Sequence, residues 1–193
     1  MTKHRLLDLL RHAVALSAGQ RLILAGSQAF YALGHSAPDL VERSEEADLL
    51  LVGADCSLFL RLEEVLGMES PHLRETGVFA HPVGLGTIVL PAGWEERLVA
   101  FGQDEGLLNV WALEIHDLLA SKLMAGREKD FEFLRALLAH DLCDFPTLLA
   151  RMELLRASPS ANAVPDRLAR LARQLRDGHR DDLARMAEAQ LHD

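Results

Sequence analysis

Apolar residues recur at helical spacing near the start of the chain. Leu6, Leu9, Leu10 and Val14 fall on one face of a 3.6-residue repeat, and a Ser-Ala-Gly-Gln stretch follows as a stop signal. This pattern predicts an amphipathic helix over about residues 4–16.

Short apolar runs bounded by Gly, Pro or acidic residues follow in the first part of the chain. Such runs are typical of buried strands, and longer segments with helical spacing between them predict helices. The predicted strands are 21–25, 47–52, 77–81, 86–90 and a run at 107–113, and the predicted helices are 28–33 and 56–66.

The rest of the chain has helical periodicity throughout. The predicted helices are 114–125, 128–140, 144–156, 165–177 and 179–191. The fold class is therefore α+β, with a small mixed β-sheet and flanking helices followed by a C-terminal helical region. We expect an α/β core over residues 1–113 and the helical region over residues 114–193.

Composition and charge exclude several classes of function. The formal net charge of −9 disfavours broad nucleic-acid binding, which requires many phosphate contacts by basic residues. No uncharged apolar run is long enough to span a membrane, and Asp8 interrupts what would be the apolar core of a signal peptide. We expect a cytoplasmic protein.

Cys56 and Cys143 lack zinc-site spacing and are predicted to be small buried side chains.

The first candidate for chemistry is the junction at Gly26 and Ser27. A glycine lets the backbone approach a phosphate, the serine hydroxyl is a donor, and a helix start supplies N–H groups and a favourable dipole. A Gly-Ser turn before a helix is also a common capping arrangement without any ligand. Both interpretations stay open from these two residues alone.

The second candidate is the acidic pair Glu46 and Asp48 at the start of an apolar strand. Residues two apart in a strand point to the same side, where two carboxylates can hold a divalent cation. Such a cation is what metal-assisted phosphoryl transfer requires. The alternative is a solvated acidic loop before a buried strand.

The third candidate is the segment from Lys122 to Asp130. Lysine is a compact cation suited to a triphosphate, and Arg127 can bind a pair of oxygens with its guanidinium group. The alternative is an exposed corner between two helices, which is our interpretation for Lys129. Lys122 lies beside an apolar face, where a charge needs a partner or a ligand.

The nine histidines, His81 among them, show no spacing that pairs them with Cys or with each other as metal ligands. The sequence therefore predicts structural or surface roles for them.

Together, and in this order, these segments resemble the bacterial nucleotidyltransferase-like proteins of the polymerase-beta superfamily, of the abortive-infection toxin type. The resemblance covers about residues 20–155. The pieces that carry it are Gly26-Ser-Gln-Ala29, Ser44-Glu-Glu-Ala-Asp48, Leu90-Pro-Ala-Gly-Trp-Glu-Glu-Arg-Leu98 and Asp117-Leu-Leu-Ala-Ser-Lys-Leu-Met-Ala-Gly-Arg-Glu-Lys-Asp130.

The resemblance implies roles for seven residues. Gly26 and Ser27 would hold the phosphates of a nucleoside triphosphate, and Glu46 and Asp48 would be the catalytic pair that binds Mg²⁺. Lys122 would contact the triphosphate, while Arg127 and Asp130 would complete or brace the pocket.

This sequence departs from the superfamily pattern at two places. The metal pair begins with Glu46 where the superfamily has Asp, and no third carboxylate is evident on a neighbouring strand. The departures leave three readings: a weakened metal site, another donor such as His81, or an enzyme that has lost its activity.

Three functional hypotheses remain from the sequence. The leading one is transfer of a nucleoside monophosphate from an NTP to an acceptor hydroxyl on tRNA, a protein or a small molecule. The second is a catalytically inactive binding or regulatory module, as one half of a toxin–antitoxin pair. The third is an interface for a homodimer or other partner on the Arg-rich helix that carries Arg167, Arg170, Arg173 and Arg176, a pattern that is also typical of a solvated helix face.

Overall fold

The computed structural model describes residues 1–34 and 39–191. Its contacts divide the chain into two compact units. The first comprises Met1–Ile88 and Glu95–Ile115, and the second comprises Val89–Trp94 and His116–Asp193. The boundary expected near residue 113, between the α/β core and the C-terminal helical region, stays a prediction.

The first unit is built on a five-stranded mixed sheet, with the strand order β3-β2-β1-β5-β4. Its elements are α1 (Lys3–Leu16), β1 (Leu22–Leu24), the 3₁₀ helix η1 (Ser27–Leu33), α2 (Asp39–Glu42), β2 (Glu46–Leu50), α3 (Cys56–Leu66), α4 (Pro71–Thr76), β3 (Phe79–Val83), the 3₁₀ turns η2 (Leu85–Thr87) and η3 (Trp94–Arg97), β4 (Val99–Ala100) and β5 (Val110–Ala112).

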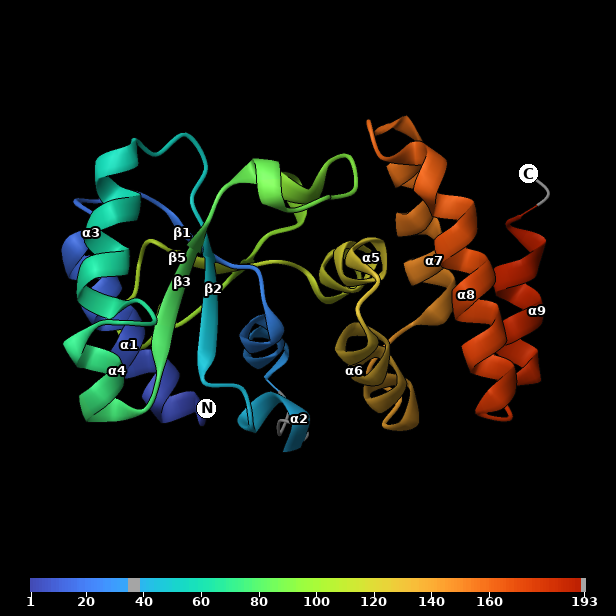
Figure 1. The fold of residues 1–193 in the computed structure, drawn as a ribbon, viewed down its shortest axis with the longest axis horizontal. Coiled ribbons are helices and arrows are strands. Elements are labelled where there is room, and N and C mark those ends of the chain that lie inside the picture. Colours follow the sequence, from blue (N-terminus) through green and yellow to red (C-terminus); the bar gives the residue numbers. More distant parts are fainter. Residues whose placement is uncertain (35–38, 192–193) are drawn as a thin grey trace. The chain divides into compact units, whose positions relative to one another are not determined.

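Strand directions in this sheet decide which residues become neighbours. β1 is antiparallel to β2 and parallel to β5, β2 is parallel to β3, and β4 is antiparallel to β5. All three residues of β1 are buried, as expected for the central strand of a sheet. Helices α1, α3 and α4 lie together on one side of β2 and β3 (Figure 1).

Local signals explain where the helices of this unit begin. The side chains of Thr2, Asp55 and Ser70 accept hydrogen bonds from the backbone at the starts of α1, α3 and α4. Leu6, Leu9 and Leu10 of α1 and Leu62 and Leu66 of α3 are fully or almost fully buried and form the helical side of the core.

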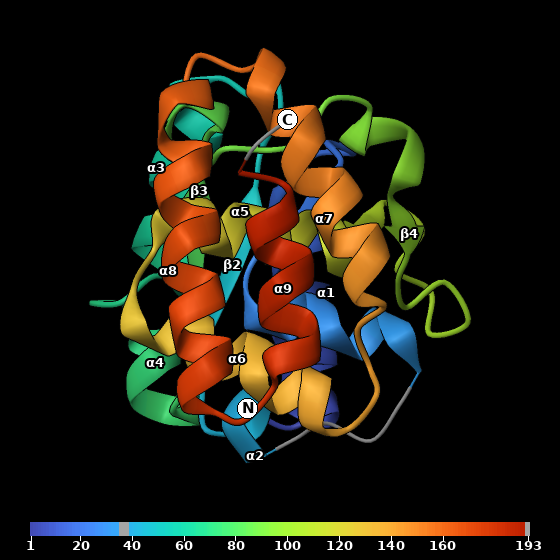
Figure 2. The same cartoon turned by 90° about the vertical axis from the view of Figure 1, so that its right-hand side faces the viewer.

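The second unit is helical. Its elements are α5 (Ile115–Ala125), which starts at the last residue of the first unit, α6 (Glu128–Ala139), α7 (Phe145–Leu154), the 3₁₀ turns η4 (Leu155–Ala157) and η5 (Ala161–Ala163), α8 (Val164–Asp177) and α9 (Asp181–Ala189). Helices α8 and α9 run side by side, and α7 contacts α9 (Figure 2). Leu168 and Leu171 of α8 and Leu183 of α9 lie in the apolar core of this unit.

The α+β class predicted from the sequence is confirmed, but several local predictions are wrong. Residues 86–90 do not form a strand, because Thr87 closes a 3₁₀ turn with both its N–H and its hydroxyl bonded to the Gly84 carbonyl. β4 pairs with β5 instead. Pro82 does not end β3, because β3 is an edge strand where a missing N–H is tolerated.

Two further expectations need correction. Residues 27–33 form a 3₁₀ helix, which has a different hydrogen-bond pattern from the expected α-helix. The cysteines are not buried, since Cys56 is exposed at the start of α3 and Cys143 is only half-buried. Within residues 1–34 and 39–191, no helix is both long and apolar enough to cross a bilayer.

Candidate functional site

Glu46 and Asp48 point to the same side of β2, as their spacing predicts. Both carboxylates are half-buried, while Ala47 and Leu49 face the other side of the strand and are fully buried. Packing of those two apolar side chains into the core therefore fixes the direction of the acidic pair.

The end of β1 places Gly26 directly beside Asp48. The two strands are antiparallel, and the N–H of Ala25 donates to the Asp48 carbonyl over 3.0 Å. A Cβ atom built on Gly26 would lie 1.9 Å from Asp48 Oδ2 and 2.8 Å from Asp48 Cγ. Only a residue without a side chain leaves room for this carboxylate, which is a physical reason for glycine here.

Strand β3 brings a third donor to the acidic pair. In the parallel register of β2 and β3, Asp48 is directly opposite His81, and Glu46 is opposite Phe79. His81 Nδ1 lies 2.9 Å from Glu46 Oε1 and 3.3 Å from Asp48 Oδ1. One potential ligand atom from each of Glu46, Asp48 and His81 lies within 4.8 Å of the other two. We call these three residues the carboxylate–histidine trio.

The trio fits a divalent cation by its chemistry. Two carboxylate oxygens and one imidazole nitrogen converge on one side of the sheet, and these are donor types that bind divalent ions. About half of the His81 side chain, 32% of Glu46 and 30% of Asp48 are exposed, so water or a substrate can reach the same point.

Ser27 follows Gly26 as the first residue of η1 and is half-buried. The backbone of Gly26, the residue before η1, is extended, and Gly26 has no side chain that could cap the start of this helix. The strand–Gly-Ser–helix junction expected from the sequence is thus present, with a 3₁₀ helix of seven residues.

A comparison with protein families identifies a family for most of the chain. Residues 4–169 match the family described as "Nucleotidyltransferase of unknown function (DUF6036)". The chain belongs to this family. Comparisons with curated proteins and with solved structures gave no significant match. The nucleotidyltransferase-like fold suggested by the sequence is therefore confirmed at the level of the family.

The second unit holds the other site residues that the resemblance implies. Asp130 is fully buried and accepts from two cations. Arg127 donates through Nε to Asp130 Oδ2 over 2.7 Å and through Nη2 to Oδ1 over 3.2 Å, and Lys122 Nζ donates to Oδ1 over 3.3 Å. Asp130 is therefore the partner that the position of Lys122 requires.

The two cations around Asp130 differ in exposure. The Lys122 side chain is only 13% exposed, and its Nζ lies 4.8 Å from the centre of the Phe133 ring. The Arg127 side chain is 57% exposed. Since a ligand must reach the charge from solvent, Arg127 is the more accessible of the two.

Two arginines of α8 donate hydrogen bonds to other residues of the second unit. Arg167 Nε donates to the Met124 carbonyl, and Arg170 donates to the Gly126 carbonyl and to Glu128. Gly126 has a φ of +68°, and a Cβ there would lie 2.5 Å from Arg167 Nη1. These contacts fix the turn between α5 and α6 that carries Arg127, a role that helical spacing alone did not indicate.

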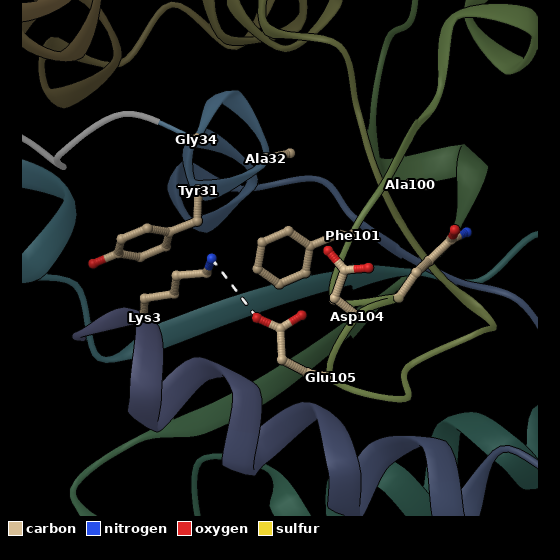
Figure 3. Close-up of a pocket in the computed structure, with 10 residues that line it drawn as sticks. Lys3, Tyr31, Ala32, Gly34, Ala100, Phe101, Asp104 and Glu105 are labelled. Atoms are coloured by element: carbon tan, nitrogen blue, oxygen red, sulfur yellow. Dashed lines mark ion pairs between the residues drawn. The ribbon is translucent and has the colours of Figure 1, made fainter.

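A separate cavity of about 310 Å³ lies in the first unit, between the start of α1, the end of η1 and the loop after β4. Its lining includes Lys3, Tyr31 and Phe101, and Lys3 forms an ion pair with Glu105 across it (Figure 3). None of the carboxylate–histidine trio lines this cavity. It is open and polar, and its lysine already has an acidic partner.

Proposed function

We propose that this protein transfers a nucleoside monophosphate from a nucleoside triphosphate to an acceptor hydroxyl. The observation that carries the proposal is the convergence of the Glu46 and Asp48 carboxylates beside Gly26 in a member of a nucleotidyltransferase family. In this reaction the acceptor oxygen bonds to the α-phosphorus, and the bond from that phosphorus to the bridging oxygen of the β-phosphate breaks. Pyrophosphate leaves, and the hydroxyl proton passes to water.

In this proposal Glu46 and Asp48 hold the divalent cation, with Mg²⁺ as the ion expected from the sequence. When bound, such a cation would neutralise charge on the triphosphate. Gly26 leaves room for the Asp48 carboxylate, and the Ser27 hydroxyl donates to a phosphate oxygen. The acceptor is tRNA, a protein or a small molecule.

The roles proposed for the second unit follow from the contacts of Asp130. A buried carboxylate that accepts from two cations restricts both side chains, which lowers the entropy lost when either binds an anion. Arg127 contacts phosphate through the exposed part of its guanidinium group, and Lys122 contributes positive charge. Asp130 positions both.

A second candidate function is a binding or regulatory module without catalysis. The observation in its favour is that His81 Nδ1 faces both carboxylates, at a position where the superfamily pattern leads us to expect an acid. His81 Nδ1 contacts both carboxylates directly, and these contacts need no metal. This candidate predicts no dependence of nucleotide binding on a divalent cation.

Calorimetry on the full chain tests the proposal. ATP, GTP, CTP and UTP are titrated with and without Mg²⁺ or Mn²⁺ into the wild type, a Glu46→Gln/Asp48→Asn double variant and a Glu45→Gln control. Glu45 is the neighbouring acid, and it is exposed. We expect cation-dependent binding of at least one nucleotide in the wild type and the control, and its loss in the double variant.

Binding that needs no cation and survives in the double variant would favour the second candidate. If none of the four nucleotides binds under any of these conditions, the transfer function is excluded, and a regulatory role through a protein partner is the candidate that remains. Where one nucleotide binds, release of pyrophosphate from it in the presence of candidate acceptors identifies the acceptor class.

A further inference from the structure

His81 is a candidate metal ligand in addition to the two carboxylates, Glu46 and Asp48, that the resemblance assigns to the metal. We infer that His81 Nδ1 is the third protein ligand of the divalent cation, and that this nitrogen makes the site prefer Mn²⁺ to Mg²⁺. The inference rests on the proposed function, because it concerns the same cation.

The spacing of the donor atoms supports this assignment. A cation with metal–ligand bonds of about 2.1 Å separates neighbouring ligands by roughly 3 Å in octahedral geometry. His81 Nδ1 lies 2.9 Å from Glu46 Oε1 and 3.3 Å from Asp48 Oδ1, which is close to that separation. The ring nitrogen contacts both carboxylates directly, at separations that neighbouring ligands of one ion also have.

Packing does not account for an imidazole at this position. β3 is an edge strand, and the His81 side chain is 49% exposed, so it fills no part of the core. The direction of the His81 side chain is nevertheless fixed by the strand. Backbone pairing sets His81 opposite Asp48, and Phe79, two residues earlier in β3, is buried. A side chain that is fixed in direction yet open to solvent is suited to binding a ligand.

The chemistry of the donors determines the preferred ion. Mg²⁺ favours oxygen ligands and loses its water slowly, whereas imidazole nitrogen binds transition-metal ions well and carboxylate oxygens also suit Mn²⁺. A site with two carboxylates and one imidazole therefore favours Mn²⁺ over Mg²⁺. Replacing His81 with a carboxylate removes the basis of that preference.

Electron paramagnetic resonance on the full chain tests the inference without relying on activity. Mn²⁺ is titrated in the absence of nucleotide, and the free-ion signal gives the affinity; Mg²⁺ is then added as competitor. Pulsed measurements detect nitrogen bound to Mn²⁺, and a chain labelled with ¹⁵N-histidine shows whether that nitrogen is an imidazole. The variants are His81→Ala and His81→Asp, with His4→Ala as the control.

His4 is a suitable control because it is an exposed histidine beside a carboxylate, Asp8, outside the trio. We expect one tight Mn²⁺ site with a histidine nitrogen signal in the wild type and in His4→Ala. His81→Ala abolishes that signal and weakens Mn²⁺ binding by at least about tenfold, with a smaller effect on Mg²⁺. His81→Asp reduces the preference for Mn²⁺.

Two results would overturn the inference, and they differ in what they say about the proposed function. If Mn²⁺ binds, is lost in Glu46→Gln/Asp48→Asn, but shows no histidine nitrogen and is unaffected by His81→Ala, the inference fails and the carboxylate site stands. If neither ion binds the wild type, with or without nucleotide, the metal-dependent function fails too. The nitrogen signal is read in the wild type, so an unstable variant does not affect this result.

Discussion

Gly26 and Asp48 are in such close contact that no side chain fits between them. A Cβ on Gly26 would overlap the Asp48 carboxylate, at 1.9 Å from Oδ2. The glycine at the end of β1 therefore determines where one of the two candidate metal ligands on β2 can lie. The Gly-Ser junction and the acidic pair, which look like independent features in the sequence, form one steric unit.

The first prediction follows from that contact. Gly26→Ala displaces the Asp48 carboxylate and weakens Mn²⁺ or Mg²⁺ binding by at least about tenfold, measured by calorimetry. The backbone of Gly26 is extended, a conformation that alanine adopts without strain. Gly86→Ala is the matched control, because a Cβ there meets nothing within 4 Å. Equal metal affinity in both variants would contradict this steric role.

The second prediction concerns Asp130. Asp130→Ala leaves the largely buried Lys122 and the adjacent Arg127 without their shared acceptor, and removing one partner from a buried ion pair costs about 3–5 kcal/mol in the free energy of unfolding. Urea unfolding followed by circular dichroism measures this cost. Lys129→Ala, at an exposed position on the same helix, should change stability by no more than about 0.5 kcal/mol.

The third prediction concerns a buried ion pair of α5 and α7. Arg151 Nε lies 3.1 Å from Oδ1 of the fully buried Asp117. Asp117→Leu or Arg151→Met alone should destabilise the protein by about 3–5 kcal/mol, because each leaves a charge without this partner in a buried setting. The double variant should lose less than the sum of the two single losses. Additive losses in a double-mutant cycle would show that the pair is not coupled.

The fourth prediction is a pH dependence at His72. Burial lowers the pKa of His72 below its ordinary value of 6.5, the nearby His12 lowers it further, and Glu75 opposes the shift. The two imidazole rings meet edge to face, 5.3 Å apart. Below pH 6.5 the unfolded chain binds a proton at His72 that the folded chain resists, so stability falls as the pH drops from 6.5 toward the folded-state pKa.

Urea unfolding at pH 7.5, 6.5 and 5.5 measures this slope in the wild type and in His72→Gln. We expect the variant to have a shallower slope over that range. His140→Gln, which removes an exposed histidine of the second unit, should retain the wild-type slope. If His72→Gln retains it as well, the pH dependence arises elsewhere.

The sequence by itself determined the positions of most helices and the direction of the acidic pair. Both depend on local periodicity: apolar residues at helical spacing predict α1 and α3, and a spacing of two in a strand puts Glu46 and Asp48 on one side. It also led to the nucleotidyltransferase family. It failed at residues 86–90, where a hydrogen-bonded turn overrides a β-prone composition.

Only the tertiary structure decided which distant residues meet. His81 is 33 residues from Asp48, and the parallel register of β2 and β3 sets them opposite each other. That register depends on hydrogen bonds and packing between segments that are separated by α3 and α4, which local spacing does not encode. The contact of Gly26 with Asp48 likewise exists only because β1 and β2 pair antiparallel. Register also decides the face, because a one-residue slip of β2 would turn both carboxylates to the other side of the sheet.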